Sequence, residues 1–114
     1  MQILEHIHLS VDSIAATENF LSIALPDFKP RGKGISEHHG NWLHIGTETS
    51  YVALTEVEGA KPVKNLRHIG VVVDDAQALI ERLRSAGIEP SDVSALDEHP
   101  HRRRVYYVDE NGLD

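Results

Sequence analysis

Two histidines recur at equivalent places in the chain, and each lies near the start of a strand-like segment. His6 lies in EHIHLSVD (5–12) and His68 lies in RHIGVVVD (67–74). Neutral imidazole is a good ligand for iron, manganese, nickel or zinc, so two histidines facing one cavity could hold a divalent metal ion. A metal held this way would act on substrate oxygen atoms as a Lewis acid. Taken alone, a histidine on a strand is more often a structural or solvated residue.

Other catalytic patterns are absent from the sequence. The chain has no cysteine, which excludes disulfides and thiolate metal sites. It has no glycine-rich phosphate loop and no G-x-S-x-G motif, so phosphoryl transfer and hydrolysis through a serine nucleophile have no support. Tyr51, Tyr106 and Tyr107 are possible proton donors, although tyrosines on strands mostly serve packing.

An internal repeat organises the chain. A shift of 62 residues places segment 4–28 over segment 66–90, with eight identical pairs among 25 positions, where about one or two are expected by chance. The pairs are Leu4/Leu66, His6/His68, Ile7/Ile69, Val11/Val73, Asp12/Asp74, Ala16/Ala78, Leu21/Leu83 and Ala24/Ala86. We therefore interpret the chain as two copies of one structural unit.

Each copy begins with alternating residues and then changes to helical spacing. The alternation predicts a strand with one apolar face and one histidine-bearing face. The apolar faces are Ile7, Leu9 and Val11 in the first copy and Ile69, Val71 and Val73 in the second; the opposite faces are His6, His8 and Ser10, and His68, Gly70 and Val72. Asp12 and Asp74 are predicted to cap the helices that follow, and Gly87 is predicted to end the second helix.

Further strands are expected after each helix. In the first copy they fall near 28–35, 42–45 and 51–57, with turns at 32–34 and 46–50. In the second copy they fall near 89–93 and 103–109, followed by a turn at 109–112. The chain is expected to be a single domain (1–114) with a first module at 1–57, a linker at 58–65 and a second module at 66–114.

This order resembles the vicinal oxygen chelate superfamily, the group of glyoxalases, bleomycin-resistance proteins and dioxygenases. The resemblance is carried by the two openings EHIHLSVD and RHIGVVVD and by the ending RRRVYYVDENGLD (102–114). It implies an α+β fold in which two tandem βαβββ modules form a curved sheet around a cavity, with helices outside. The last strand of the second module would be missing from this sequence.

The resemblance also implies a site. His6 and His68 would be the metal ligands, and a third ligand, a carboxylate, would lie beyond Asp114. Ala53 stands where some members carry a glutamate, which argues against a four-ligand site of the glyoxalase I type. Truncation, a two-histidine site and the absence of a metal therefore all remain open.

Several other side chains are expected around the cavity. His8 shares the face of His6, and Trp42 and His44 would face the cavity if Leu43 and Ile45 face the helices. Trp42 would then be either a wall for a ligand or core filling. The full predicted cavity set is His8, Trp42, His44, Tyr51 and Ala53. His38, His39, His99 and His101 are expected in loops.

Two functions from different classes follow. The first is a divalent-metal-dependent enzyme of lyase, isomerase or dioxygenase type that acts on a small oxygen-bearing molecule. The alternative is a metal-free protein that binds or sequesters a drug, similar to bleomycin-resistance proteins. The net charge of −7 favours a cationic drug, whereas an aromatic content of only 5% counts against such a groove.

Charge and hydropathy also limit the partners. An acidic chain is a poor ligand for nucleic acid, and no apolar run approaches the roughly 20 residues that span a membrane. No signal peptide is evident, so we expect a cytoplasmic protein. We expect a homodimer, because a curved sheet with an unpaired edge exposes backbone groups. Strand exchange between two chains is one such arrangement.

Overall fold

The computed structural model describes residues 4–38, 40–61, 68–91 and 105–109. Across these residues it contains four strands and two helices, so the predicted α+β class is confirmed. In chain order the elements are β1 (His6–Val11), α1 (Ile14–Ala24), β2 (Lys29–Ser36), β3 (Gly40–Gly46), β4 (Tyr51–Glu56) and α2 (Ala76–Ser85).

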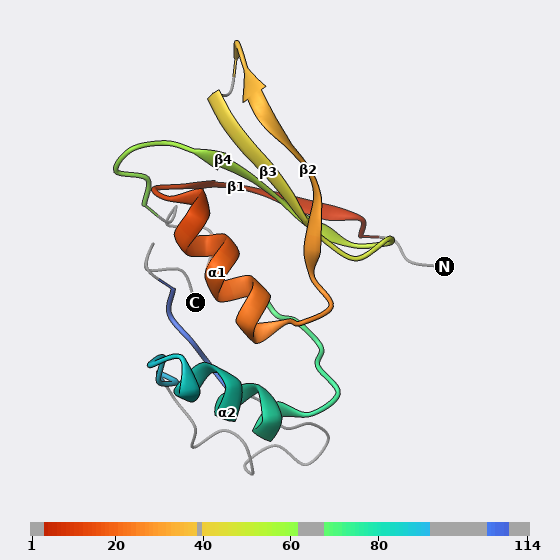
Figure 1. Cartoon of the computed structure of the whole chain (residues 1–114), viewed down its shortest axis with the longest axis vertical. Coiled ribbons are helices and arrows are strands. Elements are labelled where there is room, and N and C mark those ends of the chain that lie inside the picture. Colours follow the sequence, from red (N-terminus) through yellow and green to blue (C-terminus); the bar gives the residue numbers. More distant parts are fainter. Residues whose placement is uncertain (1–3, 39, 62–67, 92–104, 110–114) are drawn as a thin grey trace.

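The strands form one curved sheet in the order β1-β4-β3-β2. β1 pairs with β4 in parallel, and the two remaining pairs are antiparallel. Helix α1 lies between the sheet and α2, while the hairpin of β2 and β3 extends away from both helices (Figure 1). The first copy of the repeat thus forms the predicted order of one strand, one helix and three strands.

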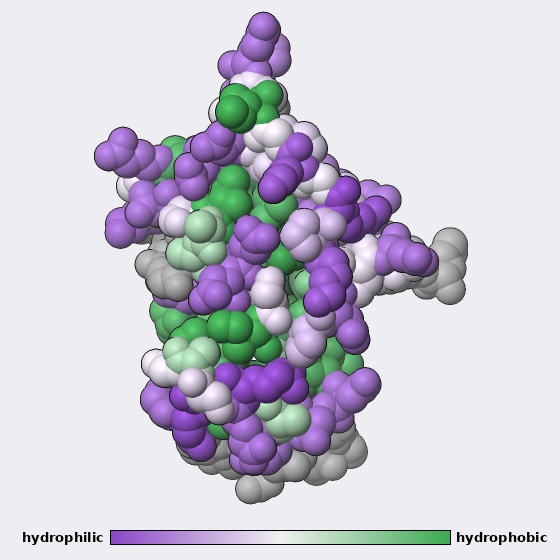
Figure 2. Space-filling view, in the orientation of Figure 1, coloured by the Kyte–Doolittle hydropathy of each residue, from purple (hydrophilic) through white to green (hydrophobic). Residues whose placement is uncertain are grey.

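Two clusters of buried residues hold these layers together. The sheet cluster is Val11, Leu43, Ile45 and Leu54, each at most 2% exposed, with side chains of α1 packed against it. The helix cluster is Ala24, Leu79 and Leu83, and it joins α1 to α2. Hydrophobic surface is also visible between the two helices (Figure 2). Because α1 contributes to both clusters, it couples the sheet to the second copy.

The helix caps differ from the prediction by one residue in both copies. The caps are Ser13 and Asp75, whose side chains accept hydrogen bonds from the backbone N–H groups of Ala16 and Ala78. An N-cap side chain accepts from an N–H two or three residues later, so Asp12 and Asp74 are one residue too early for these two N–H groups. The expected cap Asp12 instead accepts a hydrogen bond from the N–H of Gly59. The equal shift in both copies keeps the caps at equivalent repeat positions.

Gly87 ends α2, as predicted. Its φ is +81°, in the left-handed region that glycine adopts without a steric penalty. The N–H groups of Gly87 and Ile88 donate to the carbonyl groups of Arg84 and Leu83, both at 2.9 Å. This double hydrogen bond is a Schellman motif, and it satisfies carbonyl groups that the helix end would leave unpaired.

The turn predicted at 32–34 is wrong, because these residues lie inside β2. Pro30 pairs with Ile45 while Gly32 pairs with His44, so Arg31 is an extra residue in a β-bulge. The bulge moves the later residues of β2 by one position and thereby exchanges the two faces of the strand. The other predicted turn, at 46–50, is confirmed by a hydrogen bond from the N–H of Thr47 to the carbonyl of Ser50.

The second copy does not form the expected strands in its described residues. Segment 68–73 and residues 89–91 contain no strand, and within 105–109 only Tyr106 forms a bridge, with its carbonyl accepting from the N–H of Ser91. A strand exists only through hydrogen bonds to a neighbour, and no described strand pairs with segment 68–73. Residues 110–112 of the closing turn and 62–65 of the linker lie outside the described residues, and the module boundaries remain predictions.

Candidate functional site

The candidate site is a cavity of about 260 Å³ on the face of the sheet that points away from the helices. Strand alternation places every second residue of β1, β3 and β4 on this face. The lining residues are His6, His8, Ser36, Trp42, His44, Tyr51, Ala53, Leu54 and Thr55. The structure therefore brings together His6 and all five side chains predicted around the cavity, which the sequence spreads over 48 residues.

Strand register explains the shape of the cavity floor. Ala53 of β4 pairs with His8 on one side and with His44 on the other. The two histidine positions are therefore two strand spacings apart, roughly 10 Å. The small side chain of Ala53 lies between them and leaves space for a ligand.

Four rings form a continuous row across this face, which we call the ring row: Trp42, His44, Tyr51 and His6. The ring centroids of Trp42 and His44 are 4.9 Å apart, and those of His44 and Tyr51 are also 4.9 Å apart. His6 stacks on Tyr51 at 4.7 Å with an interplanar angle of 14°. These separations are typical of favourable ring contacts. The low aromatic content of the whole chain therefore understates the stacking surface at this site.

Trp42 is seated against the glycines of β2. A Cβ atom added to Gly34 would lie 3.1 Å from the indole Nε1, and one added to Gly32 would lie 3.5 Å from the ring. The distance at Gly34 is tighter than an ordinary contact, whereas the distance at Gly32 is an ordinary van der Waals contact, so the indole position depends mainly on Gly34. The bulge at Arg31 is responsible, because a regular strand would place Lys33 opposite Trp42 instead. No pattern in the sequence indicates this role of the glycines.

Electrostatics keep His44 neutral. Burial lowers the pKa of its imidazole below 6.5, and unfavourable electrostatic interactions with His6, Arg31 and His8 lower it further. A neutral imidazole presents one N–H donor and one acceptor nitrogen. His44 can therefore donate to a ligand oxygen or accept from a ligand hydroxyl at neutral pH.

The other two histidines have polar partners. The Nδ1 atom of His6 lies 2.9 Å from the carboxylate of Glu5. His8 shares a hydrogen bond with the buried hydroxyl of Thr55 through its Nε2 atom. These contacts fix the orientation of both rings on the face.

Arg31 is a cation that the sequence analysis did not single out. Its guanidinium carbon lies 4.4 Å from the centroid of the Tyr51 ring, at the edge of the ring row. It forms no ion pair with a carboxylate among the described parts of the chain. No motif marks this residue, since its position depends on the β-bulge.

His68 lies apart from this cavity. Its ring is exposed and contacts the edge of Tyr106 at a centroid distance of 6.1 Å. It does not line the cavity that holds His6. Within the described ranges, no three histidine, aspartate or glutamate side chains converge on a position that could hold a metal ion. The described donor set of one chain therefore does not fit the expected metal centre, and the metal role of the two histidines remains a prediction.

The ring of Tyr106 contacts His68, whereas Tyr107 has different surroundings. Tyr107 packs against the helix cluster, with its ring 6.2 Å from that of Phe20. Its hydroxyl is buried and has no hydrogen-bond partner among the described residues, and burial raises the pKa of Tyr107.

Of the predicted loop histidines, His38 is exposed in the turn between β2 and β3, and the other three fall outside the described residues.

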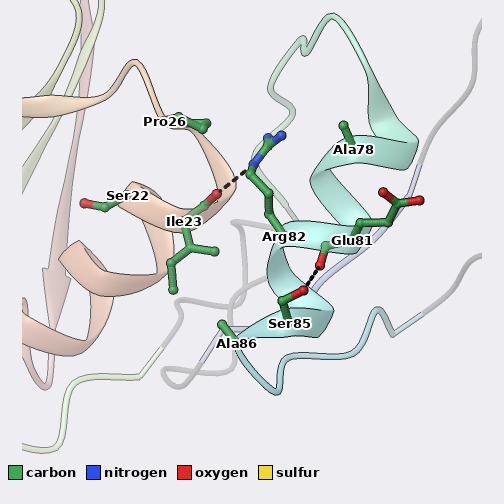
Figure 3. Close-up of a pocket in the computed structure, with 8 residues that line it drawn as sticks. All are labelled: Ser22, Ile23, Pro26, Ala78, Glu81, Arg82, Ser85 and Ala86. Carbon is green, nitrogen blue, oxygen red and sulfur yellow. Dashed lines mark hydrogen bonds between the residues drawn. The ribbon is translucent and has the colours of Figure 1, made fainter.

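A second depression, an open groove of about 620 Å³, lies between α1 and α2. Arg82 donates a hydrogen bond to the carbonyl of Ile23, and Ser85 donates to the carbonyl of Glu81 (Figure 3). Arg82 also donates to the carbonyl of Ala24. Arg82 thus satisfies carbonyl groups at the end of α1. Its structural role accounts for the polar contacts in the groove, so we place the candidate site on the sheet.

Comparisons with known proteins identify the fold. No family model matches the chain, and no curated protein matches it. Among solved structures, the chain is similar to a glyoxalase family protein from Enterococcus faecalis, with a TM-score of 0.78 and 19% identity over 98% of this chain and 93% of that chain. The chain has the vicinal oxygen chelate fold.

Two further structures with the vicinal oxygen chelate fold have different activities. The trypanothione-dependent glyoxalase I of Leishmania major has a TM-score of 0.76 and 17% identity over 99% of this chain and 83% of that enzyme. TnmS3, an antibiotic-binding protein from Streptomyces sp. CB03234, has a TM-score of 0.72 and 19% identity over 99% of this chain and 91% of that protein. The same fold therefore serves both an enzyme and a binding protein, and these identities establish the fold alone.

Neither helix in the described residues is long and apolar enough to cross a membrane.

Proposed function

We propose that this protein binds a small organic molecule on the sheet face, with the ring row as the main contact surface. The observation that carries the proposal is the unbroken series of rings from Trp42 to His6 along a cavity of about 260 Å³. Ligand pockets typically have volumes of about 300–1,000 Å³, so this cavity fits a small ligand of one or two rings. The antibiotic-binding protein TnmS3 supports a binding role for this fold.

The single tryptophan allows a direct test of this proposal. Trp42 is the only tryptophan of the chain, so the protein has one indole N–H resonance in its NMR spectrum. A ligand on the ring row should shift this resonance, and His44→Ala should weaken binding. His68→Ala is the matched control, because His68 lies outside the cavity. A screen of one- and two-ring compounds in which none shifts the Trp42 resonance would refute the binding role.

A divalent-metal-dependent enzyme of lyase, isomerase or dioxygenase type is the second candidate. One contact favours it: Glu5 lies 2.9 Å from Nδ1 of His6. A carboxylate that accepts the Nδ1 proton leaves Nε2 free as a ligand, an arrangement common around metal-bound histidines. FosX of Listeria monocytogenes, a fosfomycin resistance protein that is also similar to this chain, has been crystallised with Mn(II). His68 and a carboxylate would have to reach His6 from elsewhere, for example from a second chain.

Metal analysis separates the two candidates. Elemental mass spectrometry should be applied to the protein after it has been exposed in turn to iron, manganese, nickel and zinc. The enzyme candidate requires near-stoichiometric metal that is lost in both His6→Ala and His68→Ala. Ligand binding that depends on His6 but not on His68, without stoichiometric metal, would support the binding role alone.

We further propose that the protein forms a homodimer. Val71 and Val72 are 52% and 97% exposed in the single chain, although their segment has a strand-like pattern. Pairing of this segment with a second copy would satisfy its backbone groups and cover both side chains. Light scattering should give twice the mass of the chain, and a monomer at micromolar concentration would contradict this proposal.

A further inference from the structure

Resting on the proposed binding function, we propose that the ligand is a small planar aromatic acid. Its ring would stack on the ring row, and its carboxylate would bind the guanidinium of Arg31. Two independent features of the cavity, its rings and its charge, support this ligand class.

The ring row favours a planar aromatic ligand over an aliphatic one. Its four rings come from three adjacent strands and contact one another at centroid separations of 4.7–4.9 Å, so aromatic groups line the cavity from Trp42 to His6. Trp42 is held in position by its contacts with Gly32 and Gly34, which means that little side-chain freedom is lost when a ligand binds. Stacking on such rings adds stabilisation beyond the burial of area.

The local charge favours an anion, although the whole chain has a net charge of −7. None of the side chains that line the cavity is an aspartate or a glutamate. The carboxylate of Glu5, next to His6 in the sequence, already contacts Nδ1 of His6. The expectation of a cationic drug, which rested on the net charge of the whole chain, therefore has no support from the side chains that line this cavity.

Arg31 supplies the recognition of the acid. The β-bulge places its guanidinium 4.4 Å from the centre of the Tyr51 ring, and no described carboxylate neutralises it. A guanidinium is planar and offers paired N–H donors that match the two oxygens of a carboxylate. The neutral imidazole of His44 can provide an additional N–H donor next to Tyr51. A cationic ring would instead be repelled by Arg31.

Four matched probes test this inference by calorimetry, with the Trp42 indole resonance as the reporter of location. The probes are naphthoate, its neutral analogue naphthamide, the cation naphthylmethylammonium, and the saturated acid decahydronaphthoate. We expect naphthoate to bind at least about tenfold more tightly than the amide, because a charge-assisted hydrogen bond is stronger than a neutral one. The saturated acid and the cation should bind more weakly than naphthoate.

Two variants on one strand assign the effect to Arg31. Arg31→Gln should abolish the preference for naphthoate over naphthamide. Lys33→Gln, on the same strand but paired with Leu43 on the opposite face, is the matched control and should retain the preference. Thermal unfolding of each variant verifies that it is folded.

The outcomes separate this inference from the proposed function. Equal binding of naphthoate and naphthamide, or tighter binding of the cation, together with a shifted Trp42 resonance, would overturn the aromatic-acid inference and keep the binding function. Binding of decahydronaphthoate as tight as that of naphthoate would overturn the stacking part of the inference. If none of the four probes binds, the aromatic-acid inference fails, and the screen of one- and two-ring compounds then decides whether the binding function stands.

Discussion

The first copy of the repeat places four strands side by side, whereas the described residues of the second copy contain one helix and a single bridge at Tyr106. The difference does not come from the opening sequences, which share the same alternation and several identical residues. The difference comes from the strands that do or do not pair with each opening segment. β1 pairs with β4 over six positions, from His6 with Tyr51 to Val11 with Glu56, while the equivalent segment 68–73 has no described strand beside it.

This difference shows which structural property is local and which is not. A helix closes its hydrogen bonds within its own segment, so α1 and α2 form at equivalent positions with equivalent caps. A strand depends on residues that are distant in the sequence. The same pattern therefore gives a paired strand in one copy and exposed valines in the other. The site follows this rule, because its rings come together only through paired strands.

The largest expected effects come from the centres of the two clusters. Leu54→Ala in the sheet cluster and Leu83→Ala in the helix cluster each remove a side chain that is at most 1% exposed. Each should lower the free energy of unfolding by about 2–5 kcal/mol in urea titrations. Because α1 packs in both clusters, we expect Trp42 fluorescence and far-UV circular dichroism to give coincident transitions. A Leu83→Ala variant with an unchanged Trp42 transition would show that the two regions unfold separately.

Glycine substitutions should lower stability strongly in the first copy and only slightly in the second copy. A Cβ atom at Gly46 would lie 2.2 Å from the carbonyl oxygen of Ser50, so Gly46→Ala forces the backbone between β3 and β4 to move. It should cost about 1–3 kcal/mol of stability in the same titrations. Gly70→Ala is the control from the second copy, because no atom lies within 4 Å of its added Cβ. Equal destabilisation by the two variants would contradict the contrast.

Equivalent positions of the repeat give a more direct comparison. Leu9 packs against the sheet cluster, and its equivalent Val71 is 52% exposed. Leu9→Ala should cost about 2 kcal/mol, whereas Val71→Ala should change the stability of the monomer by less than about 0.5 kcal/mol. The titrations should be repeated at several protein concentrations. A cost for Val71→Ala that grows with concentration would indicate that a second chain covers this segment.

The smallest expected effect is a pH dependence that arises at His44. The pKa of His44 is lowered below 6.5 in the folded protein by burial and by unfavourable electrostatic interactions with His6, Arg31 and His8. As the pH falls below 6.5, the unfolded state takes up this proton more readily, so stability is lost. His44→Gln should reduce this loss between about pH 7.5 and pH 5, measured by urea unfolding. His68→Gln is the control, and an unchanged pH dependence in His44→Gln would exclude His44 as its source.

Much of the first copy could be predicted because its patterns are local. The alternation from His6 to Val11 predicted which residues face the helices, and the order of its strands and helix followed from turn and helix signals. The helix end at Gly87 was predictable because a glycine at that position has a specific backbone role. The caps were missed by one residue, since Asp12 and Ser13 are both acceptable caps by type and only the contact of Asp12 with Gly59 separates them.

The candidate site was predictable in its members but not in its arrangement. Alternation placed His8, His44 and Tyr51 on one face, yet the ring row depends on the register between β1, β4 and β3. Arg31 was missed because a bulge is a property of two paired strands, and nothing in the segment KPRGKG marks which residue is extra.

The amino-acid sequence by itself determined the repeat, the two helices, the end of the second helix at Gly87, and the apolar and histidine-bearing faces of the first strand. These features depend on residues within one or two turns or on strict alternation, so short segments suffice. Only the tertiary structure decided which strand-like segments pair, that His6 joins the ring row while His68 stays outside the cavity, and that Arg31 lies over Tyr51. The physical reason is that strand pairing is a long-range interaction, whose partners and register are fixed by the packing of the whole sheet.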